Sequence, residues 1–215
     1  MITYKEEIYD SILNYDEEGL KNICKSTLDK DKIKPIDLVN IIGDIMSEYG
    51  EKFEKEEIML PELIVVANIV KSAIDEIIDP AIRASGEKRE SKGKIVIGTV
   101  ESDIHSIGKD LVASFLFSNG FEVYNLGVDV PAEKFLEKAE EVNADIIGLS
   151  SLITLSLDFQ KQVIDVLIKN GVRDKYKVIV GGAPTSADWA RKIGADAWAD
   201  DSLEAVKKVN ELLKK

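Results

Sequence analysis

One histidine dominates the chemistry that this sequence could support. The chain of 215 residues contains a single histidine, His105, and Asp103 precedes it by two positions. One imidazole cannot hold a zinc or iron site by itself, because those sites need several protein ligands. It could be the axial ligand of a cofactor that brings its own equatorial ligands, with Asp103 on the second ring nitrogen. On spacing alone, an ordinary loop histidine hydrogen-bonded to a nearby aspartate is the commoner arrangement.

Short β-branched runs alternate with helix-like segments from residue 94 onward. The predicted strands cover 94–100, 121–126, 144–149, 177–180 and 195–199. The first three predicted helices between them cover 107–118, 131–142 and 157–169. Thr185 and Asp201 are expected to begin the last two helices. This alternation predicts an α/β fold with a flavodoxin-like or Rossmann-like doubly wound, parallel, five-stranded sheet.

Residues 1–83 have helical rather than strand-like spacing. Apolar side chains form one stripe from Leu38 to Phe53 and a second stripe from Leu63 to Ile77. Several amphipathic helices of this length predict a helical bundle. The polar segment 84–93 contains two glycines and is predicted to be a linker to a second domain over 94–215.

In an open parallel sheet, ligands bind beyond the carboxyl ends of the strands, where the strand order reverses. The loops after the first, third and fourth predicted strands should therefore build a site. Ser150, Thr154 and Ser156 could contact a buried polar ligand or could cap the next helix. Gly181 and Gly182 could let the backbone approach a ligand or could form a plain turn. Their shared position at adjacent strand ends is a stronger signal than any one of them.

Composition narrows the possible functions. The net charge is −12, from 28 basic and 40 acidic residues, which argues against binding the phosphate backbone of a nucleic acid. No apolar run approaches the roughly 18 residues of a membrane helix, and the N-terminus has no signal-peptide pattern. Cys24 is the only cysteine, which excludes a disulfide framework or a thiolate metal cluster and fits a cytoplasmic location.

These motifs resemble the cobalamin-binding fold of methionine synthase and of the corrinoid proteins in methylotrophic methyl transfer. The signature of that family is Asp-x-His-x-x-Gly, then Ser-x-Leu, then Gly-Gly. The chain has residues 103–108, 150–152 and 181–182 in that order. Segments 50–53 and 60–63 resemble the helical cap that precedes the corrinoid fold. The resemblance covers nearly the whole chain and implies an N-terminal helical bundle cap before a Rossmann-like corrinoid domain.

The resemblance also implies a cofactor and a binding site. A cobalamin or related corrinoid would bind in the base-off/His-on form, with His105 as the lower axial ligand of the metal, cobalt. Asp103 and Ser156 would continue a hydrogen-bonded chain from His105. The other implied cofactor-binding residues are Ser106, Ile107, Gly108, Ser150, Leu152, Thr154, Gly181, Gly182, Gly98 and Met59.

Within that set, the implied tasks differ. Ser150, Leu152 and Thr154 would line the pocket of the displaced nucleotide tail, and the strand glycines, with Gly98 in the first strand, would leave room for it. The cap would cover the methyl-bearing face of the cofactor, with Met59 where an aromatic residue is frequent. Ser102 stands where relatives often have glycine.

The function implied by the resemblance is that of a methyl carrier. A methyl group on cobalt would pass from a substrate-specific corrinoid methyltransferase to an acceptor methyltransferase that uses a pterin or a thiol. A reductive activase is a further expected partner. Catalysis would belong to these partners, so the chain itself is not expected to be an enzyme. Methylamines, quaternary amines, methanol, methoxy compounds and methyl thiols all remain open as donors of one-carbon metabolism.

Four other interpretations start from the same residues. A receiver-like signalling domain shares the architecture and would use Asp103 as phosphoacceptor, but it leaves the helical half unexplained. A corrinoid mutase subunit would share His105 without a cap. A corrinoid-based sensor could share the cap, yet no segment of the sequence suggests DNA binding. A structural adaptor without a cofactor is the fourth.

Overall fold

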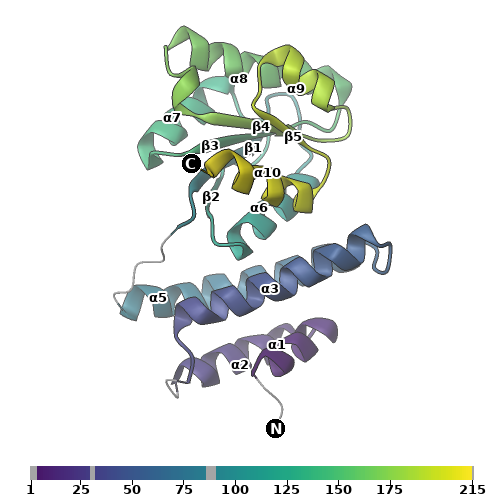
Figure 1. Cartoon of the computed structure of the whole chain (residues 1–215), viewed down its shortest axis with the longest axis vertical. Coiled ribbons are helices and arrows are strands. Elements are labelled where there is room, and N and C mark those ends of the chain that lie inside the picture. Colours follow the sequence, from purple (N-terminus) through teal and green to yellow (C-terminus); the bar gives the residue numbers. More distant parts are fainter. Residues whose placement is uncertain (1–3, 30–31, 86–90, 215) are drawn as a thin grey trace. The chain divides into compact units, whose positions relative to one another are not determined.

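The computed structural model describes residues 4–29, 32–85 and 91–214 (Figure 1). It divides into two compact units, a helical unit that contains α1 to α5 and a sheet unit that begins at Ser91.

The helical unit is built from amphipathic helices. They are α1 (Tyr4–Leu13), α2 (Glu17–Asp29), α3 (Pro35–Glu54), α4 (Leu60–Ala73), the π-helix η1 (Ile74–Ile78) and α5 (Asp79–Ser85). Pro35 and Pro61 lie in the first turns of α3 and α4, where a missing N–H breaks no helical hydrogen bond. The predicted bundle is confirmed. Within the described residues, no helix is long and apolar enough to cross a membrane.

The π-helix η1 changes the expected apolar stripe. Leu63, Val66 and Val70 are buried as predicted, but at the end of η1 Ile78 is buried whereas Ile77 is only half-buried. A π turn contains an extra residue, so it shifts the buried face by one position. The following helix α5 continues to Ser85, so the first two residues of the predicted linker are helical. Residues 86–90 of that linker lie outside the described residues.

The sheet unit has the predicted doubly wound architecture. Its strands are β1 (Lys94–Thr99), β2 (Glu122–Asn125), β3 (Ile146–Ser150), β4 (Lys177–Gly181) and β5 (Ala197–Ala199). All neighbouring strands are parallel, and their order is β2-β1-β3-β4-β5. The order reverses between β1 and β3. The switch point therefore lies where the sequence predicts it.

Helices cover both faces of the sheet (Figure 1). The helices α7 (Ala132–Val142), α8 (Leu157–Lys169) and α9 (Ala187–Ile193) pack on one face. On the opposite face lie α6 (Ile107–Ser118) and α10 (Ser202–Leu213). The strands are rich in buried Val and Ile on both faces, as expected for a parallel sheet between two helical layers. Two short 3₁₀ turns complete the unit, η2 (Thr154–Ser156) and η3 (Arg173–Lys175).

The starts of the last two helices test the predicted caps. Asp201 caps α10, since its carboxylate accepts hydrogen bonds from the backbone N–H groups of Leu203 and Glu204. The prediction for Thr185 is wrong, because Ser186 caps α9. The Thr185 hydroxyl instead donates to the Gly182 carbonyl and accepts from the Trp198 indole at 2.9 Å.

The cap of α10 leads to a first prediction. Replacing Asp201 by alanine removes both hydrogen bonds and should lower the free energy of unfolding by about 1 kcal/mol. Asp201→Asn is the matched control, because asparagine caps helices about as well. Urea denaturation measures both variants. Equal losses in the two variants would mean that the hydrogen bonds contribute nothing to stability.

Candidate cofactor site

The carboxyl ends of β1, β3 and β4 lie side by side at the switch point. Thr99 pairs with Ser150, and Ser150 pairs with Gly181. The loops that follow these three residues therefore begin at one level of the sheet. This register brings Asp103, His105 and Ser156 together although up to 53 positions separate them in the sequence.

The Asp103 carboxylate is the centre of the site, and its side chain has no exposed surface. Its Oδ1 accepts the backbone N–H of His105 at 3.0 Å and lies 2.8 Å from His105 Nδ1. Its Oδ2 accepts the Ser156 hydroxyl at 2.8 Å and the Leu152 N–H at 2.7 Å, with the Ile153 N–H at 3.3 Å. Burial acts to raise the pKa of Asp103, but hydrogen bonds from His105, Leu152 and Ser156 together hold this pKa well below its usual range.

The contact with Asp103 orients the imidazole of His105. A carboxylate on Nδ1 favours the tautomer with the proton on that nitrogen, which leaves the lone pair on Nε2. The His105 side chain is half exposed, and no residue in the described ranges hydrogen-bonds Nε2. Nε2 is therefore the ring atom that is free to bind a metal.

Other contacts hold the loop that carries His105. The Thr99 hydroxyl donates to the His105 carbonyl at 2.8 Å. The Asp129 carboxylate accepts the Ser102 N–H at 2.7 Å, and the Asp129 N–H donates to the Asp103 carbonyl at 2.9 Å. Ser102 has a φ of 65°, in the left-handed region that favours glycine.

Family models and curated relatives match most of the chain. Two models, each described as a B12 binding domain, match residues 93–207 and residues 4–78. The dimethylamine corrinoid protein of Methanosarcina barkeri is 40% identical over 209 residues, which cover 97% of this chain and 96% of that protein. The chain belongs to the B12-binding corrinoid proteins.

Solved structures extend the similarity to the whole corrinoid protein. A cobalamin-binding protein from Desulfitobacterium hafniense DCB-2 is 30% identical with a TM-score of 0.75, and the match covers 99% of each chain. A chain of the methanol:cobalamin methyltransferase complex from Methanosarcina barkeri is 25% identical with a TM-score of 0.84. That match covers 98% of this chain and 79% of the other. The similarity therefore includes both the helical unit and the sheet unit.

Several large apolar side chains of this corrinoid protein are exposed near the carboxyl ends of the strands. Those in or directly after the loops that follow β1, β2 and β3 are Ile104, Ile107, Val128, Leu152 and Leu155. Ile104, which adjoins His105 in the chain, is 75% exposed, and Leu155 is 86% exposed. Exposed apolar side chains in the loops that hold Asp103 and His105 suit contact with the broad, largely apolar ring of a corrin.

The glycines of the corrinoid protein have different surroundings. A Cβ on Gly98 would lie 2.8 Å from the Phe135 ring, on the face covered by α7. Ser150 and Gly181 alternate with Leu149 and Val180 of that face, so they point to the opposite one. Gly98 and Gly181 therefore lie on opposite faces of the sheet. The geometry does not support the prediction that Gly98 helps to leave room for the nucleotide tail beside Gly181 and Gly182.

Gly182 and Gly108 are glycines for separate reasons. Gly182 has a φ of 113°, and a Cβ there would lie 1.8 Å from the Ser151 carbonyl oxygen. Glycine thus allows the loops after β3 and β4 to approach each other. A Cβ on Gly108, in the first turn of α6, would meet nothing within 4 Å, so the space above this position is open to a ligand.

The remaining predicted residues are only partly joined to the site. Ser106 hydrogen-bonds Asp110, and Thr154 is exposed at the start of η2. Met59 is 68% exposed in the helical unit, so its contact with a cofactor stays a prediction. The sequence analysis missed Ser151, whose buried hydroxyl lies 2.7 Å from the Ser156 hydroxyl. Ser151 is the variable middle residue of the Ser-x-Leu motif, so the motif itself gave no signal for it.

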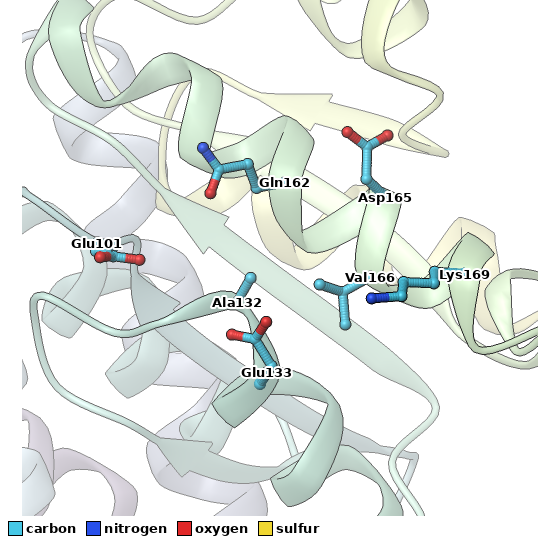
Figure 2. Close-up of a pocket in the computed structure, with 7 residues that line it drawn as sticks. All are labelled: Glu101, Ala132, Glu133, Gln162, Asp165, Val166 and Lys169. Carbon is cyan, nitrogen blue, oxygen red and sulfur yellow. The ribbon is translucent and has the colours of Figure 1, made fainter.

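A cavity of about 330 Å³ lies away from these residues, between α7 and α8 (Figure 2). Its lining comprises Glu101, Ala132, Glu133, Gln162, Asp165, Val166 and Lys169. None of the predicted cofactor residues is among them. In the described part of the chain, no group of three or more His, Cys, Asp or Glu side chains could hold a metal ion. The His105 loop is therefore the better candidate for the cofactor.

The low pKa of Asp103 predicts how stability depends on pH. Because the pKa is lower in the folded chain than the unfolded value of about 3.9, the carboxylate stabilises the fold above about pH 4. This stabilisation should decrease as the pH falls towards the folded pKa. The gap between the free energies of unfolding of wild type and Asp103→Asn, measured by urea denaturation from pH 7 to pH 3, should therefore stay constant down to about pH 4 and narrow below it. Asp165→Asn is the control, and a gap for Asp103→Asn that stays constant below about pH 4 would contradict the prediction.

The close approach at Gly182 predicts a second difference in stability. Gly171 also has a positive φ, of 69°, but a Cβ there would meet nothing within 4 Å. Gly171→Ala should therefore cost only the backbone term, about 1–2 kcal/mol. Gly182→Ala adds a collision with the backbone of Ser151 and should cost clearly more. Urea denaturation measures the free energy of unfolding of both variants. A smaller loss of free energy for Gly182→Ala than for Gly171→Ala would show that the two loops separate easily.

Proposed function

We propose that this chain is a methyl-carrying corrinoid protein that binds a cobalamin or related corrinoid base-off through His105. The observation that carries the proposal is the half-exposed imidazole whose Nδ1 lies 2.8 Å from a fully buried carboxylate. Such a carboxylate contact fixes ring orientation and raises the basicity of the other nitrogen, as in protein metal sites generally. The similarity to corrinoid proteins over 97% of the chain supports the same function.

A bound corrinoid would supply the cobalt that carries the methyl group. His105 would be the protein ligand of that metal through Nε2, and Asp103 would hold the proton of the ring on Nδ1. Ser156 donates to the far oxygen of Asp103, which helps to hold the carboxylate in its orientation towards His105.

The other predicted residues would surround the cofactor. Ile107, Leu152 and the open space above Gly108 face the ring in this proposal, with Ser106 beside the ligand. Ser150, Thr154 and Gly181 with Gly182 would receive the nucleotide tail at the ends of β3 and β4. Met59 would contribute from the helical cap.

The domain division follows from the same proposal. The helical cap would comprise residues 1–83, the linker 84–93 and the corrinoid domain 94–215. The two family matches, which end at residue 78 and begin at residue 93, support a boundary in this interval. The helical extension to Ser85 shortens the linker at its start.

Transfer of the methyl group would require separate partners. A substrate-specific methyltransferase would load the carrier, an acceptor methyltransferase using a pterin or thiol would unload it, and a reductive activase would restore an oxidised cobalt. Relatives named for dimethylamine and for a methanol:cobalamin methyltransferase complex support methyltransferase partners. Their names also differ in the methyl donor, so the donor is recognised by the partner and not by the features described above.

The receiver-like alternative is less consistent with the site. A phosphoacceptor aspartate must be reachable by a phosphodonor. The Asp103 side chain has no exposed surface, and both its oxygens accept hydrogen bonds from the loops around it. The carboxylate is therefore committed to holding His105 and the loop after β3.

The first experiment mixes purified apo-protein with hydroxocobalamin, removes excess cofactor and records the visible spectrum. We expect near-stoichiometric retention and a base-off/His-on spectrum. His105→Ala should lose this spectrum, because no other imidazole is available in the chain. Lys161→Met, on the outer surface of α8, is the matched control and should behave like wild type. An unchanged spectrum in His105→Ala would refute axial ligation by this residue.

A further inference from the structure

A buried lysine lies one turn from the proposed ligand. Lys109 is in the first turn of α6, and its side chain is only 1% exposed. Burial of an ammonium group costs free energy unless it is paired, and the positive end of a helix dipole is an unfavourable place for a cation. The partners of Lys109 must therefore offset both the burial of its ammonium group and the repulsion from the helix dipole.

Two side chains offset that cost. Lys109 Nζ lies 2.5 Å from Asp110 Oδ1 and 2.7 Å from Asn125 Oδ1, at the end of β2. Asn125 also donates from its amide nitrogen to Asp110 Oδ1 at 2.8 Å, so the three groups form a closed triangle. Burial acts to raise the pKa of Asp110, but hydrogen bonds from Lys109, Asn125 and Ser106 hold it below its usual value.

The triangle joins two loops. On one side, Asp110 hydrogen-bonds the side chain of Ser106, the residue next to His105, and the Asp110 N–H donates to the Ser106 carbonyl at 2.8 Å. On the other side, Asn125 Oδ1 accepts the Gly127 N–H at 3.0 Å. The loop after β1 is thus attached to the loop after β2 at the end nearest His105.

A second attachment holds the opposite end of the same loop. Asp129 accepts the Ser102 N–H and donates its own N–H to the Asp103 carbonyl. The segment 101–106 is therefore held to segment 125–129 both before Asp103 and after His105. Without the triangle, the histidine end of the loop would be anchored by the Asp103 contacts, the Thr99 hydroxyl and the backbone hydrogen bond from Asp110 to Ser106.

We propose that Lys109 is a positioning residue of the corrinoid site, which acts through Asp110 and Asn125 to hold the His105 imidazole in its ligating orientation before the cofactor binds. The role of this orientation in cofactor binding rests on the proposed function, but the ordering of the ring in the apo-protein does not. A ligand that is already oriented loses less conformational freedom on binding, which favours the complex. The ordered ring can therefore be tested in the apo-protein.

The test uses the fact that His105 is the only histidine. In ¹⁵N-labelled apo-protein without a polyhistidine tag, the imidazole gives a single set of NMR signals. We expect wild type to show one tautomer, protonated at Nδ1, with a rigid ring. Lys109→Met should lose this state, with a shift of the ring ¹⁵N signals towards a tautomer mixture and faster ring motion. Lys161→Met removes an exposed, ion-paired lysine of α8 and should leave the signals unchanged.

A charge exchange separates positioning from general destabilisation. Asp110→Asn leaves the buried ammonium without a carboxylate and should perturb the imidazole as Lys109→Met does. The double variant Asp110→Asn/Asn125→Asp returns a carboxylate to within reach of Nζ and should restore the wild-type signals. Restoration would support the proposal even if Lys109→Met does not fold. Wild-type signals in folded Lys109→Met, or no restoration in the double variant, would overturn it.

Cofactor binding provides an independent readout. Titration with hydroxocobalamin should give a Kd for Lys109→Met about tenfold higher than for wild type, the usual effect of removing a group that orients a ligand. If wild type itself fails to bind, the proposed function fails, whereas the NMR measurement still decides the proposal for Lys109. If wild type and Lys109→Met bind equally, the positioning proposal fails and the proposed function stands.

Discussion

The structure around the switch point depends on one buried carboxylate. Asp103 has no exposed surface, so every hydrogen bond that water would make must come from the protein. The donors come from two loops, the backbone of His105 on one side and Leu152, Ile153 and Ser156 on the other. Satisfying this carboxylate therefore fixes both loops relative to each other and aims the imidazole at the same time.

Much of this arrangement could be predicted from the sequence. The doubly wound parallel sheet follows from the alternation of β-branched runs and helices, and a flavodoxin-like strand order places the switch point correctly. The family resemblance predicted the contact of Asp103 with His105 and Ser156. Strands and helices can be recognised in a sequence because each buries apolar residues at a fixed spacing along the chain. The cap of α10 by Asp201 could also be predicted, because an N-cap residue hydrogen-bonds groups within four residues of itself.

Other features depend on contacts that no local pattern records. Gly98 reads like a ligand-binding glycine, but which way a strand residue points depends on the register, and Phe135 occupies its side of the sheet. The extra residue of η1 displaces burial from Ile77 to Ile78. Lys109 resembles any surface lysine, and only the end of β2 supplies the asparagine that buries it. Each miss involves a partner distant in sequence or a departure from regular geometry.

The π turn has a consequence for the evolution of the helical unit. One residue corresponds to about 100° of rotation around an α-helix, so the extra residue in η1 turns everything after it by that angle. Before the turn, α4 packs against α1, α2 and α3, whereas α5 beyond it packs against α3. A single inserted codon is thus enough to rotate the apolar face at the end of a continuous helix, while the contacts of its first half stay intact.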